Sequence, residues 1–309
     1  MDLIFMGTPD FSVGTLELLV QAGHKVSLVV TQPDKPKGRG KSIQFSPVKE
    51  AALSHGLTVY QPKRIREPEC IEHLRKYHAD AIVVVAFGQI LPKEILEMPR
   101  YGCINVHASL LPKYRGASPI QWAVIEGEPV SGVTTMRMDE GLDTGDIILK
   151  EEVRLHDGET GGSLFARLAE TGARLCQKTL EELSKGTASF TPQEHEKATY
   201  TTMIKKQLGE IDWTKPAQEL ERLIRGLDPW PSAYTRLSGK TLKVWKASVR
   251  EGTGGKKPGT VLTVGRDCLE VQTGDGILAL LEIQLEGKKR MKTEAFLRGF
   301  EIAPGTELG

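Results

Sequence analysis

The sequence predicts an α/β protein, with a doubly wound, mostly parallel, Rossmann-like sheet followed by a small OB-like β-barrel. The sheet is predicted because strand and helix signals alternate through residues 1–150. The run AIVVVAF at 81–87 is also apolar without alternation, as in a strand covered on both faces. The barrel is predicted because short strand-like runs, separated by glycines and charged turns, follow one another between residues 234 and 283.

Local signals place the elements of the first part in order. Ser12 can cap a helix whose apolar residues recur at helical spacing and which Gly23 ends, whereas Ser46 and Pro47 begin a second helix. The expected strands are 3–6, 26–30, 57–60, 81–87, 103–106, 133–138 and 147–155. The expected helices are 13–20, 47–56, 69–77, 118–125 and 161–183. Such crossovers join parallel strands into a sheet with helices on both faces.

The domain organisation follows from a change of pattern near residue 190. Apolar content falls there, so we expect a first domain over 1–189, a linker over 190–207 and a second domain over 208–309. In the second domain a helix at 216–226 precedes the short strands. These strands are expected at 234–237, 242–247, 259–264, 268–273 and 277–283.

Composition and charge exclude several classes of protein. The 309 residues carry 41 Lys and Arg against 40 Asp and Glu, so nucleic-acid contacts must be local rather than due to bulk charge. No apolar run approaches the ~20 residues that span a bilayer, and the N-terminus lacks the basic region of a signal peptide. The four cysteines lie far apart, which favours reduced thiols over disulfides or zinc. We expect a cytoplasmic protein without membrane contact.

The first strand ends in MGTPDF at residues 6–11, at the edge where a doubly wound sheet binds ligands. A dinucleotide site needs the spacing GxGxxG, and Pro9 stands where the second glycine should let a pyrophosphate approach. The sequence also lacks GxxxxGKS and GxxxxGKT. NAD-dependent enzymes and P-loop NTPases are therefore disfavoured.

Three polar residues are candidates for chemistry. Asn105 and His107 are two apart on an expected strand, so their side chains point the same way and could hydrogen-bond one carbonyl oxygen, or merely cap the strand. Asp143 lies in the segment DEGLDTGD at 139–146, which is either a solvated turn or places its carboxylate against the imidazolium of His107. The metal-binding patterns HExxH and HxH do not occur, so no metal is expected.

Basic residues gather locally despite the neutral total. The loop at 33–41 is either a solvated tip or a phosphate contact, and its cations are Lys35, Lys37, Arg39 and Lys41. Residues 236–257 hold seven Lys or Arg against one Glu, and another cluster follows at 288–292. The candidate contacts in these two stretches are Lys243, Lys246, Lys288, Lys289 and Arg290. Basic patches on both domains suit one extended polyanion.

Three segments of the first domain resemble motifs of the 10-formyltetrahydrofolate-dependent formyltransferases. They are NVHASLLP at 105–112, RGASPI at 115–120 and GLDTG at 141–145. Three more resemble those family members that formylate methionyl initiator tRNA: GTPDF at 7–11, the Arg39 loop ending in SPVK at 46–49, and VWKA at 244–247. The similarity covers essentially the whole chain.

The resemblance implies that Asn105, His107 and Asp143 form the catalytic constellation. It implies a formyl donor, 10-formyltetrahydrofolate, bound by two segments, whose residues are Ser109, Leu110, Leu111, Pro112, Phe87, Gly88, Ile90, Leu91 and Pro92. It further implies that the Arg39 loop enters the acceptor end of initiator tRNA while the OB-like domain holds the stem. A monomer that needs neither a metal nor a nucleoside triphosphate is the family expectation.

The expected chemistry is attack of the aminoacyl α-amine on the formyl carbon, which gives a tetrahedral oxyanion. Asn105 and protonated His107 would donate to that oxygen, while Asp143 keeps His107 charged and helps a water remove the amine proton. Three alternatives stay open. They are a formyltransferase for a small amine such as a nucleotide-sugar or glycinamide ribonucleotide, a 10-formyltetrahydrofolate hydrolase, and a tRNA-binding module without activity.

Overall fold

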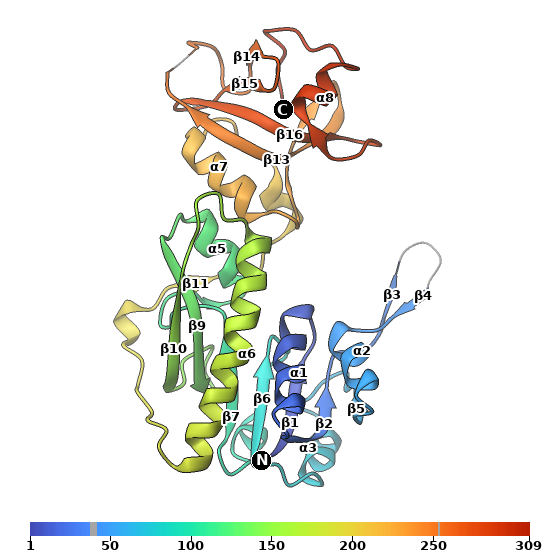
Figure 1. Ribbon diagram of the computed structural model, residues 1–309, viewed down its shortest axis with the longest axis vertical. Helices are drawn as coiled ribbons and strands as arrows, with labels where there is room; N and C mark the ends of the chain where they lie inside the picture. The colour runs from blue at the N-terminus through green and yellow to red at the C-terminus, as the bar shows by residue number, and fades with distance from the viewer. Residues whose placement is uncertain (38–41, 253) are drawn as a thin grey trace. The chain divides into compact units, whose positions relative to one another are not determined.

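The computed structural model describes residues 1–37, 42–252 and 254–309, with only the backbone described for 35–37 and 42–43 (Figure 1). The chain divides into two compact units. The first comprises Met1–Pro119, Val130–Arg154 and Phe165–Thr201. The second comprises Ile120–Pro129, Leu155–Leu164 and Thr202–Gly309. Much of the segment expected as a linker therefore belongs to the first unit.

A seven-stranded sheet forms the first unit, in the order β10-β9-β7-β6-β1-β2-β5. Five strands pair in parallel: β1 (Asp2–Gly7), β2 (Lys25–Val30), β5 (Val59–Tyr60), β6 (Ala81–Val85) and β7 (Cys103–His107). Two more add antiparallel pairs, β9 (Val130–Arg137) and β10 (Ile147–Arg154). The predicted mostly parallel sheet is confirmed. Because the strand order reverses at β1, the carboxyl ends of β1 and β6 mark the expected ligand crevice.

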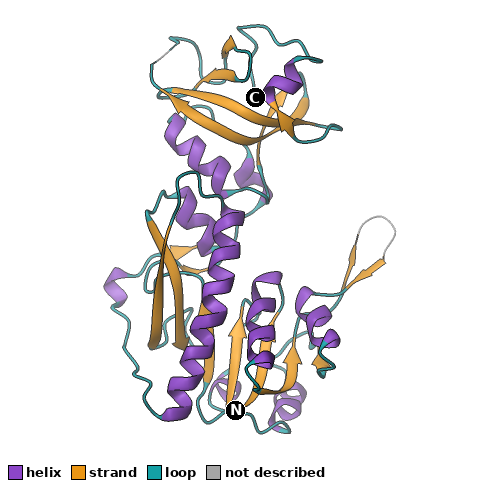
Figure 2. Cartoon of the chain, in the orientation of Figure 1, coloured by secondary structure: helices purple, strands orange, loops and turns teal. Residues whose placement is uncertain are grey.

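Helices cover both faces of this sheet (Figure 2). They are α1 (Val13–Gln21), α2 (Pro47–Ser54), α3 (Pro68–Arg75), α4 (Lys93–Leu96) and α6 (Gly161–Lys185), while α5 is Pro119–Ile125. Ile71 and Leu74 of α3 pack with Ile4 and Ile82 on one face, and on the other face Gly172 of α6 lies against the strands. Every residue of β6 and β7 is buried, and for β6 the unalternating apolar run at 81–87 predicts this.

The serines at the two predicted helix starts behave differently. The hydroxyl of Ser46 accepts a hydrogen bond from the Lys49 amide and so caps α2. The hydroxyl of Ser12 makes no such cap bond; it donates to the Val85 carbonyl at 2.6 Å. The prediction of a Ser12 cap is wrong, because this hydroxyl instead ties the start of α1 to the end of β6.

Two short pairs of strands complete the first unit. One consists of β3 (Lys35–Lys37) and β4 (Ser42–Gln44), and the other of β8 (Arg115–Gly116) and β11 (Tyr200–Thr201) in parallel. Single 3-10 turns lie at η1 (Asp10–Ser12) and η2 (His195–Lys197), whereas a third, η3 (Lys206–Gly209), belongs to the second unit. The β8–β11 pair carries residues far apart in sequence to the end of β7, where it helps to form the site.

The second unit is an antiparallel β domain with one longer helix, α7 (Ala217–Gly226). Its sheet has the order β12-β13-β16-β15-β14, with β17 paired to β16. The strands are β12 (Ala233–Leu237), β13 (Lys240–Arg250), β14 (Val261–Val264), β15 (Leu269–Gln272), β16 (Ile277–Leu285) and β17 (Met291–Lys292), and α8 is Thr293–Leu297. Leu220 and Ile224 of α7 pack into the core of this sheet. Where the sequence predicted a small OB-like β-barrel, the structure has an antiparallel β domain after the α/β sheet.

Candidate active site

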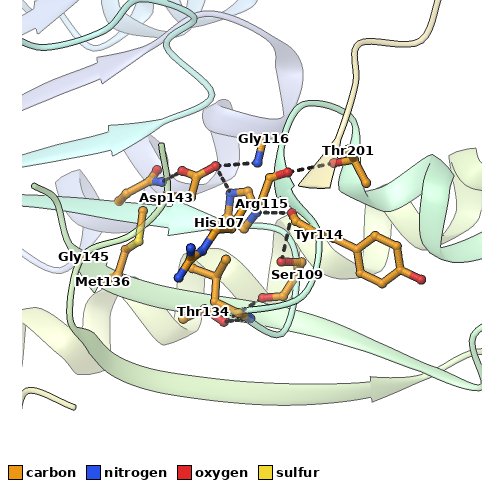
Figure 3. A network of polar contacts seen from close by, with 12 residues as sticks. His107, Ser109, Tyr114, Arg115, Gly116, Thr134, Met136, Asp143, Gly145 and Thr201 are labelled. Atoms are coloured by element: carbon orange, nitrogen blue, oxygen red, sulfur yellow. Dashed lines mark hydrogen bonds and ion pairs between the residues drawn. The ribbon is translucent and has the colours of Figure 1, made fainter. Parts of the chain in front are cut away.

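Three polar side chains converge at the end of β7. Asn105 and His107 are each 8% exposed, and the side chain of Asp143, from the turn between β9 and β10, is 13% exposed. Asp143 Oδ2 lies 3.7 Å from His107 Nδ1, and Asn105 Nδ2 donates to Asp143 Oδ1 at 3.4 Å (Figure 3). The structure thus brings together the three residues expected from the sequence, and the carboxylate is turned inward rather than into solvent.

The Asp143 carboxylate is held by the backbone as well. The Gly116 amide donates to Oδ2 at 2.8 Å (Figure 3). Asp143 itself has a φ of 53°, a left-handed conformation that costs free energy for a residue with a side chain. Such a conformation persists only where surrounding contacts fix it, so the direction of this carboxylate is built into the fold.

The two ring nitrogens of His107 have different partners. Nε2 lies 2.9 Å from the carbonyl oxygen of Tyr114. Because a carbonyl can only accept, Nε2 carries the hydrogen of this bond, which leaves Nδ1 for the second partner. Nδ1 faces Asp143. When Nδ1 carries a proton, the ring therefore forms an ion pair with the carboxylate at 3.7 Å. This distance is longer than a hydrogen bond, so the Nδ1–H is able to donate to another oxygen.

The loop after β7 is fixed by hydrogen bonds to its backbone. The Ser109 hydroxyl donates to the Lys113 carbonyl at 2.7 Å, and Lys150 Nζ donates to the Leu111 carbonyl at 2.6 Å. Thr134 accepts from the Leu111 amide and donates to the Ser109 carbonyl. These hydrogen bonds therefore fix the conformation of the loop beside the three polar residues.

The segment 87–92 lies at the carboxyl end of β6, beside the end of β1. The Phe87 carbonyl accepts from the Thr8 hydroxyl at 3.2 Å and from Gln32 Nε2 at 3.1 Å. Leu91 is buried, whereas Ile90 is 82% exposed. These bonds hold the segment at the crevice where a doubly wound sheet binds its ligand.

The residues expected at the folate fall into two groups by burial. The buried side chains are those of Phe87, Leu91, Ser109 and Leu111. The half-buried or exposed residues are Gly88, Ile90, Pro92, Leu110 and Pro112. The buried side chains pack beneath the two segments, whereas the side chains of the second group and the backbone of its glycine reach the surface.

The basic loop of the first unit is described only in part. Lys35 and Lys37 lie on β3, where the backbone alone is described, and Arg39 and Lys41 lie outside the described residues. The base of the loop is fixed by Lys49, whose Nζ donates to Asp34 at 2.6 Å. Its phosphate contacts therefore stay a prediction from the sequence.

The second unit brings two of the expected basic residues, Lys243 and Arg290, to the ring of Trp245. Lys243 Nζ and Arg290 Cζ lie 5.4 and 4.7 Å from the indole ring centre. Arg290 also pairs with Glu282 at 2.9 Å and with Asp228 at 3.3 Å. Burial raises the pKa of Asp228, and Arg290 opposes that rise. The other expected cations are exposed: Lys246, Lys288 and Lys289.

Several groups at the site were not predicted from the sequence. They are the Gly116 amide, the Tyr114 carbonyl and the side chains of Arg115 and Gln193, which hold the Asp143 turn. The residue types in a sequence do not show which backbone N–H and C=O groups will face a site. Gln193 lies in the polar segment expected to be a linker, so the sequence pattern did not predict a role for it in the site.

The thiols, the grouping of metal-binding residues and the apolar length of the helices also bear on expectations from the sequence. Burial raises the pKa of Cys103 and Cys176 to about 12, so neither is a nucleophile near neutral pH. Within the described ranges, no three His, Cys, Asp or Glu side chains are grouped so that they could hold a metal ion. No helix in the described part of the chain has the length and apolar character needed to cross a membrane.

Comparison with known proteins now adds to this geometry. Residues 1–180 match the formyl transferase family, and residues 203–301 match the C-terminal domain of that family. The chain belongs to the formyl transferase family. It is 65% identical over 306 residues to a methionyl-tRNA formyltransferase of Agathobacter rectalis, with 99% of each chain covered. It is 59% identical to a methionyl-tRNA formyltransferase of Lachnospira eligens, with both chains covered completely.

Solved structures share the formyl transferase fold at lower identity. A sugar 3N-formyl transferase, WlaRD, solved with dTDP and 5-N-formyl-THF, aligns with a TM-score of 0.69 at 18% identity, covering 94% of this chain and 99% of that one. HypX from Aquifex aeolicus, in complex with tetrahydrofolic acid, aligns with a TM-score of 0.64 at 19% identity, covering 98% of this chain and 48% of that one. At this identity the likeness shows the fold alone.

Proposed function

We propose that this protein transfers the formyl group of 10-formyltetrahydrofolate to the α-amine of methionyl initiator tRNA, for translation initiation. The observation that carries the proposal is the convergence of the Asn105 amide, the His107 imidazole and the Asp143 carboxylate within 3.4 to 3.7 Å. Full-length relatives named methionyl-tRNA formyltransferase support the choice of acceptor.

Two donors at the site suit a developing oxyanion. The amine attacks the formyl carbon, a C–N bond forms, and the formyl oxygen becomes negative. Asn105 Nδ2 carries a second hydrogen that can donate to this oxygen, and His107 donates through Nδ1–H. One such donor contributes ~2.7–4 kcal/mol to transition-state stabilisation.

Asp143 has two tasks in this reaction. Its carboxylate balances the imidazolium of His107, and it accepts, through a water, the proton that the attacking amine loses. When the intermediate collapses, the bond from the formyl carbon to the folate nitrogen breaks and that nitrogen takes up a proton. The products are the formamide and tetrahydrofolate, so atoms and charge balance.

The two ligands would use different parts of the chain. The exposed or half-buried side chains of segments 87–92 and 109–112 would contact the folate, while the buried ones shape the segments. The loop with Arg39 would enter the acceptor end of the tRNA, and the cations around Trp245 would hold its stem. In this proposal residues 1–189 carry the chemistry together with residues 190–201 of the expected linker, residues 208–309 bind tRNA, and the protein acts as a cytoplasmic monomer.

A formylation assay tests the proposal against its rivals. Purified protein is incubated with 10-formyltetrahydrofolate labelled in the formyl group and with methionyl initiator tRNA, and His107→Ala serves as the control. Labelled formyl-methionyl ester, absent with the variant, is the expected result. Labelled formate alone would indicate a hydrolase, tRNA binding without turnover a binding module, and formylation of an amino sugar or glycinamide ribonucleotide alone a small-amine enzyme.

A further inference from the structure

A buried arginine lies behind the candidate active site. Arg115 is 1% exposed, and burying a guanidinium is costly unless its donors are satisfied. Its Nε and one terminal nitrogen donate to Gln193 Oε1 at 3.1 and 2.7 Å. The remaining contacts are to the Tyr200 hydroxyl at 3.1 Å and to His195 Nδ1 at 3.2 Å. Among the described residues none of these partners is a carboxylate, so the group is held by neutral acceptors.

Gln193 links Arg115 to the Asp143 turn by hydrogen bonds. Its Nε2 donates to the Asp143 carbonyl at 2.9 Å and to the Gly145 carbonyl at 2.8 Å, and the side chain is 5% exposed. The orientation of the amide is unambiguous, because arginine only donates and carbonyls only accept. Gln193 therefore uses its oxygen for Arg115 and both amide hydrogens for the turn.

The strand that carries Arg115 also contacts Asp143 directly. Gly116, the next residue, donates its amide to the Asp143 carboxylate at 2.8 Å. This strand, β8, is held by β11: the Arg115 amide donates to the Thr199 carbonyl, and the Thr201 hydroxyl donates to the Arg115 carbonyl (Figure 3). Segment 191–201 is thus part of the wall of the site, within the first unit.

We infer that Arg115 and Gln193 are positioning residues that aim the Asp143 carboxylate at His107 Nδ1 and Asn105 Nδ2. The inference rests on the proposed function and deepens it. Asp143 adopts a left-handed conformation, and a Cβ at Gly145 would lie 1.8 Å from a neighbouring carbonyl oxygen, so the turn is tightly constrained. The two carbonyl bonds from Gln193 hold that turn against relaxation.

One substitution separates positioning from simple support of the fold. Gln193→Glu keeps the shape of the side chain and gives Arg115 a carboxylate, but it replaces the two amide hydrogens with an oxygen facing two carbonyls. We expect kcat to fall about tenfold to a hundredfold, as for a misplacement of about 1 Å. KM for both substrates should stay within about twofold and Tm within about 3 °C, since the buried cation gains a partner.

A matched control is Gln272→Glu in the second unit. Gln272 is 4% exposed, accepts from the Gly254 amide and donates to the Thr273 carbonyl, so it bridges a turn in the same manner. This control places a buried carboxylate far in sequence from Asp143, and kcat should not change.

Two readouts decide the inference. In an Asp143→Ala background, Gln193→Glu should lower kcat no further, because the positioned group is already gone; an equal loss in both backgrounds would overturn the inference. Hydrogen–deuterium exchange of residues 139–146 should be faster in Gln193→Glu than in the wild type and Gln272→Glu. Unchanged exchange would overturn the inference whether or not the wild type formylates tRNA, whereas an inactive wild type overturns the proposed function alone.

Discussion

The end of β7 and the basic surface around Trp245 hold their polar groups in opposite ways. At the end of β7 the three side chains are 8 to 13% exposed and each has a fixed hydrogen-bond or ion-pair partner. Around Trp245 the cations are half-exposed or exposed, and Arg290 already pairs with two carboxylates. Buried donors act in a low dielectric, whereas exposed charges are screened by water and salt.

The difference indicates how each region works. In the first, a single group should affect the rate of chemistry strongly and binding little. In the second, each cation should contribute a small part of the affinity for a polyanion, and none should affect the chemical step.

The largest expected effect is the loss of an oxyanion donor. His107→Ala and Asn105→Ala should each lower kcat by about a hundredfold to a thousandfold, with little change in tRNA affinity. Steady-state formylation and filter binding of methionyl initiator tRNA measure the two quantities. A large loss of affinity with intact turnover would show that these residues bind substrate instead.

A smaller effect on the same region is expected from Gly116→Ala. Gly116 has a φ of 97°, and a Cβ there would lie 2.6 Å from the Thr201 carbonyl oxygen, so its amide must move away from Asp143. We expect kcat to fall about tenfold and the free energy of unfolding by ~1–3 kcal/mol. Gly14→Ala is the control, because nothing lies within 4 Å of its Cβ position in α1. A Gly116→Ala enzyme with wild-type kcat would refute the anchoring of Asp143 by this amide.

On the basic surface, Lys246→Ala should weaken tRNA binding by no more than about fivefold. If Lys246 contacts a phosphate, the slope of log Kd against log salt concentration should fall by about one, and kcat at saturating tRNA should not change. Titrations at several salt concentrations measure this slope. An unchanged slope would remove Lys246 from the tRNA contacts.

The smallest expected effect is on stability. The hydrogen bonds from Lys49 and then Gln61 lower the pKa of Asp34. A carboxyl with a lowered folded-state pKa stabilises the fold above its ordinary value of about 3.9, and this contribution is lost as the pH falls through the folded-state value. The difference in urea midpoint between wild type and Asp34→Asn should therefore shrink on acidification from pH 7 to below about pH 4. A difference independent of pH would mean that the ion pair does not stabilise the fold.

The sequence predicted those parts of the structure that depend on local patterns. The apolar run at 81–87 predicted the buried strand β6, and the spacing of Asn105 and His107 predicted their shared direction. The contact between His107 and Asp143 could only be offered as one of two interpretations, because it depends on a turn closed by residues distant in sequence. Gln193 was missed for the same reason: polar residues in an apolar-poor segment look like a linker until their partners are known.

The most direct measurement of the central claim is the single-turnover rate of formyl transfer in Asp143→Asn, with both substrates saturating. This variant keeps the size of the side chain and can keep the Gly116 hydrogen bond, but it removes the charge opposite His107 Nδ1 and the oxygen that accepts from Asn105 Nδ2. We predict a rate at least about a hundredfold below that of the wild type, with tRNA affinity within about twofold. A rate close to that of the wild type would contradict a catalytic role for the carboxylate.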